Sequence, residues 1–170
     1  MVTFVVGGSG SGKSEYAEGI IMGGSSPNRF YIATMQPFDD EAFAKIERHR
    51  KMRAHKGFET IECQRNLAGA GVSPGSDVLL ECISNLVANE MFDPKGTKEK
   101  TTSAIMEGID RLRDLADSFV IVSNNVFGDG DDYSPETLEY IKTIAEVNGR
   151  IADISDHVVE VVCGIPVKIK

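Results

Sequence analysis

The chain has 170 residues, of which 41% are hydrophobic and 26% charged, an ordinary composition for one globular domain with a substantial core. The formal net charge of −8 and the pI of about 4.9 exclude nucleic acid as a main partner, because a phosphate backbone requires a basic surface. No apolar run reaches the length of a membrane span and no basic segment precedes the first apolar run, so the sequence predicts neither a membrane span nor a signal peptide.

The first predicted element is a strand at 2–6, and a phosphate-binding loop follows it. Residues 7–14 read G-G-S-G-S-G-K-S, the complete pattern G-x-x-x-x-G-K-S. Glycines let main-chain N–H groups turn toward a phosphate, while the Lys13 ammonium reaches the β- and γ-phosphates and the Ser14 hydroxyl binds Mg²⁺. A helix that begins at Lys13 directs its positive end at the same anion. A glycine-rich turn without a ligand is the alternative, which the complete motif disfavours. The predicted nucleotide-binding residues of the loop are Gly7, Gly8, Ser9, Gly10, Ser11, Gly12, Lys13 and Ser14.

Strands and helices alternate along the rest of the chain. Apolar or alternating runs predict strands at 30–34, 58–62, 77–81, 118–123, 157–162 and 165–169, and helical spacing predicts helices at 42–55, 83–92, 98–117 and from 135 onward. This order predicts an α/β fold that is P-loop NTPase-like, a mostly parallel sheet with helices on both faces. We expect residues 1–170 to form one P-loop nucleotide-binding domain.

Polar residues follow several of the predicted strands. Ligands of parallel sheets bind at the carboxyl ends of the strands, so we expect Gly7, Thr34, Glu62, Glu81 and residues 123–125 to surround one cleft. An acid in the position of Glu81 can hold Mg²⁺ together with Ser14, or act as a base. The alternative for Glu81, and equally for Glu62, is a strand-end carboxylate without a ligand, which in the case of Glu81 would cap the next helix.

A basic segment at 45–56 contrasts with the acidic chain. It holds six of the 18 Lys and Arg residues and two of the three histidines. On a helix His49 and Arg53 share a face. Cations there would neutralise a polyphosphate, and a neutral imidazole can attack phosphorus. A solvated basic helix face is the alternative.

Three cysteines, Cys63, Cys82 and Cys163, are odd in number and widely spaced. This pattern predicts reduced, buried thiols of a cytoplasmic protein. A catalytic thiol is the alternative.

Motifs along the whole chain resemble one enzyme family. Besides the loop at 7–14, they are Tyr-Ile-Ala-Thr at 31–34, Lys-Ile-x-x-His-Arg at 45–50 with Arg53, Leu-Leu-Glu-Cys-Ile at 79–83 with Asn89, Val-Ser-Asn at 122–124 and Gly-Ile-Pro-Val-Lys at 164–168. Together they resemble the bifunctional adenosylcobinamide kinase / adenosylcobinamide-phosphate guanylyltransferase of cobalamin biosynthesis.

The resemblance implies a function and a site. Such enzymes phosphorylate adenosylcobinamide with a nucleoside triphosphate and transfer GMP from GTP to that phosphate through a GMP–histidine intermediate. The histidine that matches is His49, whereas His55 lies outside the motif. GTP, ATP, adenosylcobinamide and its phosphate are then the expected partners, Mg²⁺ the cofactor and a homo-oligomer the assembly. Beyond the loop, the resemblance assigns to the nucleotide site Thr34, Met35, Gln36, Arg50, Lys51, Met52, Arg53, Glu62 and Glu81.

Two departures from the family pattern fall in the second half of the chain. Asn125 stands where the family usually has Glu, and residues 141–149 keep only Asn148 of the usual pattern. Two alternatives therefore remain, a guanylyltransferase with a weakened kinase half and a non-catalytic nucleotide-binding switch. The presence of His49 with Arg50 and Arg53 disfavours the switch, because a switch has no need for a nucleophile.

Overall fold

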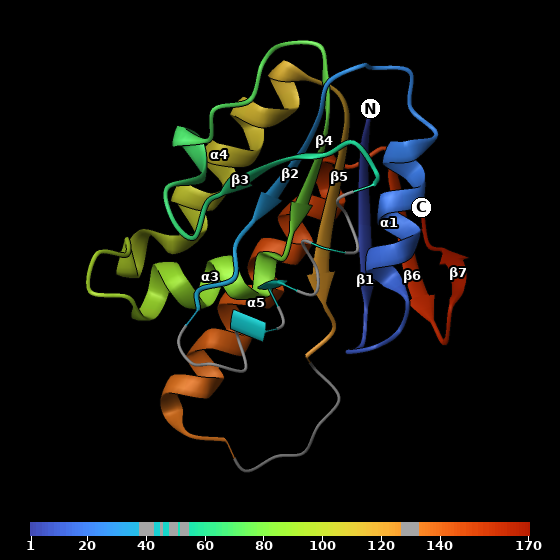
Figure 1. Cartoon of the computed structure of the whole chain (residues 1–170). Helices are drawn as coiled ribbons and strands as arrows, with labels where there is room; N and C mark the ends of the chain where they lie inside the picture. The colour runs from blue at the N-terminus through green and yellow to red at the C-terminus, as the bar shows by residue number, and fades with distance from the viewer. Residues whose placement is uncertain (38–42, 45, 48–50, 52–54, 127–132) are drawn as a thin grey trace.

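Seven strands form one sheet in the computed structural model, which describes residues 1–37, 43–44, 46–47, 51, 55–126 and 133–170. Their order across the sheet is β3-β2-β4-β5-β1-β6-β7 (Figure 1). All neighbouring strands run parallel except β7, which pairs antiparallel with β6. The strands are β1 (Val2–Gly7), β2 (Arg29–Ala33), β3 (Glu59–Glu62), β4 (Ser76–Glu81), β5 (Ala116–Asn124), β6 (His157–Val162) and β7 (Ile165–Lys168).

Helices cover both faces of this sheet, as the sequence predicts. Side chains alternate between the faces along each strand. Phe4, Leu80 and Ile121 pack with α3, α4 and α5 in one core, whereas Val5 and Leu79 pack with α1 in the other (Figure 1). The helices are α1 (Lys13–Met22), α3 (Ile83–Phe92), α4 (Thr101–Leu115) and α5 (Pro135–Ile154), with 3₁₀ turns η1 (Leu67–Gly69) and η2 (Lys98–Lys100). In the described part of the chain, none of the helices is long and apolar enough to cross a membrane.

The boundary between α4 and β5 differs from the sequence prediction. A helix was expected through residue 117, but α4 ends at Leu115 and β5 begins at Ala116. The cause is pairing with β4, because Ala116 lies opposite Ser76 and the Gly75 N–H donates to the Leu115 carbonyl at 2.8 Å. Most of the helix predicted at 42–55 lies outside the described residues.

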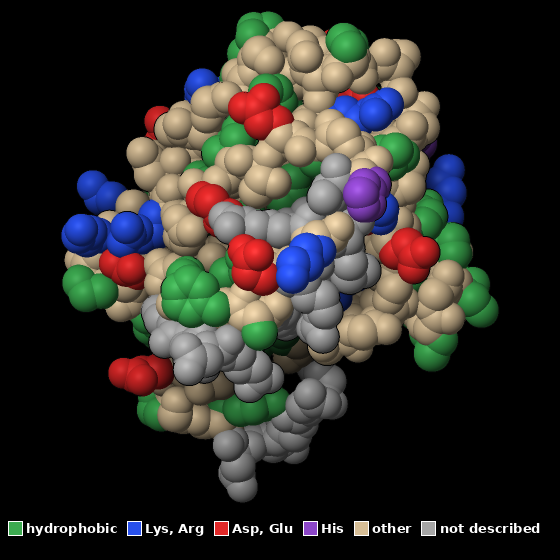
Figure 2. Space-filling model, viewed as in Figure 1, with side chains coloured by type: hydrophobic (Ala, Val, Ile, Leu, Met, Phe, Trp, Pro, Cys, Tyr) green, Lys and Arg blue, Asp and Glu red, His purple; other side chains and the backbone are tan. Residues whose placement is uncertain are grey.

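The two edges of the sheet differ in character. At one edge β3 carries Glu59 and Glu62, both exposed. At the other edge β7 is exposed along its whole length, with Ile165 at 64% and Val167 at 44%. Hydrophobic side chains gather on the right of the molecule over this strand (Figure 2). An acidic edge resists pairing with another chain, whereas an apolar one favours it.

The prediction of three buried cysteines is wrong for one of them. Cys63 and Cys82 are buried, but Cys163 is exposed, and all three are free. Cys163 and Gly164 form the two-residue turn between β6 and β7, with positive φ angles of 49° and 80°. Such a turn projects beyond both strands, so no layer covers its first residue.

Candidate functional site

The phosphate-binding loop joins the end of β1 to the start of α1. Gly10 and Gly12 have φ angles of 70° and 88°, a conformation that favours glycine. A Cβ atom at Gly7 would lie 2.6 Å from the main-chain carbonyl oxygen of Val161, so only glycine fits there. The Lys13 ammonium folds back over the loop and donates to the Gly8 carbonyl at 3.0 Å. The loop therefore has the shape that its sequence pattern predicts.

Two neighbouring segments hold this loop in place. The Gly164 N–H in the β6–β7 turn donates to the Ser11 carbonyl at 2.8 Å, and the Asn125 N–H after β5 donates to the Gly7 carbonyl at 3.0 Å. A Cβ atom at Gly12 would lie 3.3 Å from the Gly164 Cα atom. The terminal hairpin thus contacts the loop directly.

The carboxylate of Glu81 faces Ser14, the residue that follows the loop lysine. The Ser14 hydroxyl donates to one carboxylate oxygen of Glu81, and the Tyr31 hydroxyl donates to the other at 2.9 Å. A hydroxyl and a carboxylate in contact are hard oxygen ligands of the kind that Mg²⁺ prefers, so the residues present fit this ion. The capping alternative for Glu81 is wrong, since Cys82 is the N-cap residue of α3 and the two Glu81 carboxylate oxygens accept from Ser14 and Tyr31 instead.

These residues line a pocket of about 330 Å³ at the carboxyl ends of the strands. Its volume falls within the range of small-ligand sites. Lys13 enters from α1, Tyr31 from β2 and Glu81 from β4, while Glu62 closes β3 and Asn124 closes β5. The sequence prediction that strand ends surround one cleft is confirmed for Thr34, Glu62, Glu81 and Asn124, and Gly7 lies beside it in the loop.

Residues 3–169 match the family model described as cobinamide kinase / cobinamide phosphate guanyltransferase. The chain belongs to this family. Two curated relatives are each described as bifunctional adenosylcobalamin biosynthesis protein CobU. The one from Escherichia coli is 34% identical and the one from Salmonella typhimurium 37%, and both alignments cover 100% of each chain. A solved ATPase domain, 9% identical with a TM-score of 0.50 over 94% of this chain and 68% of that one, shows the P-loop NTPase-like fold alone.

The pocket of this cobinamide kinase / guanyltransferase family member contains part of the predicted site. Gln36 is directed instead toward Asp93, to which its amide donates at 3.0 Å, and Lys51 is exposed. The predicted site residues that line the pocket are Ser9, Gly10, Lys13, Ser14, Thr34, Met35, Glu62 and Glu81. His49, Arg50, Met52 and Arg53 lie outside the described residues.

Thr34 lines the pocket wall, but its hydroxyl is engaged within the protein. The hydroxyl donates to the Cys82 carbonyl at 2.9 Å and accepts from the Cys82 N–H at 2.7 Å. The side chain is fully buried. Thr34 therefore joins the ends of β2 and β4, which sets the position of Glu81 beside Ser14.

Sequence reasoning missed Tyr31, Cys82 and Asn85 as lining residues. Tyr31 belongs to the motif at 31–34, so the motif was a signal, but the pairing of its hydroxyl with Glu81 depends on the register between β2 and β4. Burial raises the pKa of Cys82, and burial with the nearby Glu90 carboxylate raises the pKa of Cys63 to about 11. Both groups are therefore neutral thiols near pH 7, which counts against either as a nucleophile.

Proposed function

We propose that the chain phosphorylates the aminopropanol hydroxyl of adenosylcobinamide with a nucleoside triphosphate, and then transfers GMP from GTP to the new phosphate. Two observations support this function: the family match over 3–169 and the contact of Ser14 with Glu81 beside the phosphate-binding loop. The contact between Ser14 and Glu81 carries most weight, because a hydroxyl and a carboxylate in contact within the pocket can together bind Mg²⁺. Residues 1–170 act as one P-loop nucleotide-binding domain, with GTP, ATP, adenosylcobinamide and its phosphate as substrates.

The phosphate-binding loop holds the triphosphate in this proposal. Main-chain N–H groups of the loop and the Lys13 ammonium bind the phosphate oxygens. Ser14 and Glu81 would hold Mg²⁺, and the bound ion would supply positive charge opposite the phosphates. Tyr31 fixes the orientation of the Glu81 carboxylate through its hydroxyl. The chain thereby binds and orients a triphosphate for attack at phosphorus.

His49 is the proposed nucleophile, although it lies outside the described residues. A neutral imidazole nitrogen attacks the α-phosphorus of GTP, the new N–P bond forms and the bond to pyrophosphate breaks. A phosphate oxygen of the acceptor then attacks the same phosphorus and releases the imidazole. Arg50 and Arg53 would stabilise the charge that develops on the transferring group.

GMP transfer alone is the second candidate function, and it rests on the position of Asn125. This residue lies beside the phosphate-binding loop, where its N–H contacts Gly7. Its side-chain amide is 3.4 Å from a carboxylate oxygen of Glu160 on β6. At this position the family usually has an acid. The loss of a carboxylate near the metal or the acceptor lowers the rate of phosphoryl transfer.

The test begins with α-labelled GTP and Mg²⁺. We expect acid-labile, alkali-stable label on the protein, the signature of a phosphoramidate, and such label excludes a non-catalytic switch. The purified protein is then assayed with adenosylcobinamide and with its phosphate separately, each with ATP and with GTP. We expect both to react, adenosylcobinamide more slowly. Product from the phosphate alone would establish the transferase-only function, and absence of label and product with either acceptor would overturn the proposal.

The proposal includes a homo-oligomer and a cytoplasmic location. The exposed apolar edge strand β7 supports the first, because such an edge favours pairing with a second copy. The free thiols of Cys63 and Cys82 support the second, because reducing compartments keep thiols free.

A further inference from the structure

A second pocket lies beside the nucleotide pocket. Its volume is about 560 Å³, and it is lined by the segment that follows β3 together with the end of α3, the turn after it and α4. Glu62, the last residue of β3, lines both pockets. A ligand that occupies the second pocket can therefore reach the nucleotide pocket by passing this carboxylate.

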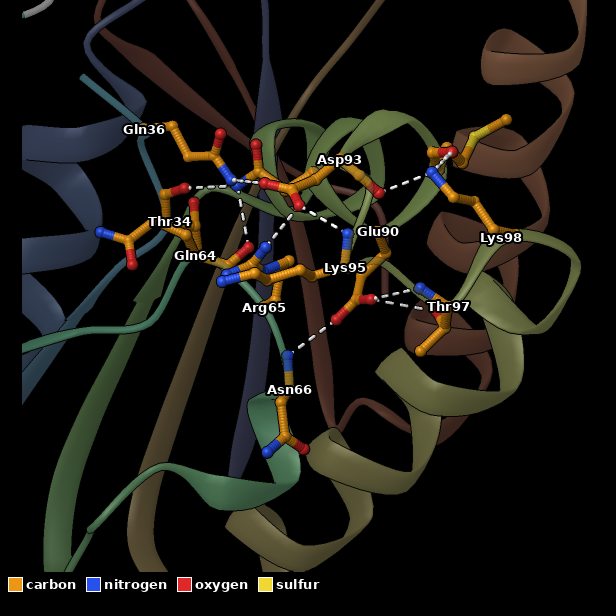
Figure 3. Close-up of polar contacts among 12 residues, drawn as sticks. Thr34, Gln36, Gln64, Arg65, Asn66, Glu90, Asp93, Lys95, Thr97 and Lys98 are labelled. Carbon is orange, nitrogen blue, oxygen red and sulfur yellow. Dashed lines mark hydrogen bonds and ion pairs between the residues drawn. The ribbon is translucent and has the colours of Figure 1, made fainter. Parts of the chain in front are cut away.

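The wall between the two pockets is fixed by one face of α3. The buried amide of Asn89 donates to the Thr34 carbonyl at 2.8 Å and to the Gln64 carbonyl at 2.9 Å (Figure 3). These contacts hold the segment after β2, on the nucleotide side, against the segment after β3, on the side of the second pocket. The two pockets consequently keep a constant relative position.

Asp93, the residue that directly follows α3, makes a similar connection. Its carboxylate accepts from the Gln36 amide at 3.0 Å and from the Arg65 guanidinium, so it also joins the two segments (Figure 3). The pKa of Asp93 is lowered to about 2, first by the hydrogen bond from the Lys95 N–H and then by the one from Gln36. The carboxylate is therefore ionised at neutral pH, which strengthens these bonds.

Hydrogen bonds to a buried carboxylate fix the inner side of the second pocket. Glu90 is only 2% exposed, and its carboxylate accepts from the Asn66 N–H at 2.7 Å and from the N–H and hydroxyl of Thr97 at 3.0 Å each. Figure 3 shows this carboxylate between the two segments that it joins. A buried carboxylate that accepts three hydrogen bonds from two residues holds a fixed position, since breaking any of these bonds leaves it poorly solvated.

The chemistry of the lining indicates the class of ligand. Small residues such as Ala68, Gly69 and Ala104 leave space, while Gln64, Asn66, Lys95 and Glu107 add polar groups. Amide and charged side chains offer both donors and acceptors, the combination that a ligand rich in carboxamides needs. A flat apolar group without polar substituents would require a more apolar lining.

We propose that this second pocket binds the carboxamide-bearing edge of the corrin ring of the acceptor, with the aminopropanol arm directed past Glu62 into the nucleotide pocket. This inference rests on the proposed function. The corrin ring is larger than the pocket, so one edge of it enters. Binding energy from this remote edge positions the reacting arm.

The test fills the pocket from α4 with Ala104→Trp and, at an exposed position that tolerates a large side chain, Glu107→Trp. Asp110→Trp is the matched control, because it lies on the same helix outside the pocket. We expect both pocket variants to raise the KM for adenosylcobinamide phosphate by about tenfold or more, since they remove remote binding of the acceptor. The control should keep the KM of the wild type.

A truncated acceptor, 1-amino-2-propanol phosphate, separates this inference from the proposed function. It cannot reach the second pocket, so its turnover should be equal in the pocket variants and the control. An unchanged KM for adenosylcobinamide phosphate in Glu107→Trp, with GMP still transferred, overturns the pocket assignment alone. A wild-type protein that neither takes label from GTP nor transfers GMP overturns the proposed function, and the acceptor pocket with it.

Discussion

Lys13 is the residue on which triphosphate binding most depends. Its ammonium lies over the loop with a side chain only 7% exposed, and among the described residues that line the pocket it is the one cation. Hydrogen bonds to charged groups contribute about 1.5–3 kcal/mol, so Lys13→Ala should weaken GTP binding by about 10- to 100-fold, measured by equilibrium titration. Lys142→Ala, at an exposed position on α5, is the control. Equal GTP affinity in the two variants would show that Lys13 does not bind the triphosphate.

Tyr31 acts on the proposed metal site through Glu81. Tyr31→Phe removes the hydroxyl that fixes one carboxylate oxygen. We expect the Mg²⁺ concentration for half-maximal activity to rise several-fold, because an unfixed carboxylate binds the ion in fewer orientations. Tyr140→Phe is the matched control, since it also deletes a hydroxyl hydrogen bond, to the Ser84 carbonyl. A similar Mg²⁺ dependence in both variants would contradict the role of Tyr31.

His49 is expected to carry GMP. An imidazole must be neutral to attack, and the neighbouring cations of the basic segment favour the neutral form. His49→Asn should eliminate the labelled adduct and GMP transfer while the fold persists, as measured by α-labelled GTP and circular dichroism. His55→Asn should change little. Label that persists in His49→Asn and disappears in His55→Asn would transfer the role to His55.

At the scale of elements, the contact between η1 and α4 depends on one glycine. A Cβ atom at Gly108 would lie 2.6 Å from the Leu67 Cβ atom and 2.9 Å from the Ala68 nitrogen. Overpacking costs about 1–3 kcal/mol, which exceeds the gain of about 1 kcal/mol that alanine brings inside a helix. Gly108→Ala should therefore lower the free energy of unfolding in urea.

Gly149→Ala is the control for this prediction. Gly149 lies inside α5, and a Cβ atom there meets nothing within 4 Å. The substitution should raise the stability by up to about 1 kcal/mol. A stabilising Gly108→Ala would show that η1 moves away from α4 without loss, and the packing described for this contact would then be wrong.

How far the sequence predicts these elements depends on the range of the interactions involved. The loop at 7–14 is predictable because its glycines meet a local requirement, and the approximate positions of strands β1 to β6 along the chain follow from short apolar or alternating runs. The position of Glu81 beside Ser14 follows from the rule of strand ends. The early start of β5 and the Asn89 contacts with Thr34 and Gln64 depend on partners distant in sequence, so local patterns do not reveal them. Cys163 is exposed because it lies in the turn between β6 and β7, and local sequence patterns do not show that this turn extends into solvent.

For the whole molecule, the contrast between the two sheet edges predicts how copies associate. β3 presents acids, which resist pairing, whereas β7 presents apolar side chains and unpaired main-chain groups. Exposed apolar area of this kind typically marks an interface. The β7 edge also lies next to the phosphate-binding loop, through the hydrogen bond from Gly164 to Ser11. Association at this edge would therefore stabilise the loop.

We expect the double variant Ile165→Lys with Val167→Lys to dissociate the homo-oligomer. The two side chains are 64% and 44% exposed in the single chain, so lysine is tolerated there in the monomer, while burying a lysine at an interface without a partner is strongly unfavourable. The molar mass, measured by light scattering after gel filtration, should fall to 18.5 kDa. Leu138→Lys, which is 42% exposed on α5, should leave the mass of the wild type unchanged. A wild-type mass of one chain, or an unaltered mass in the double variant, would exclude β7 as the interface.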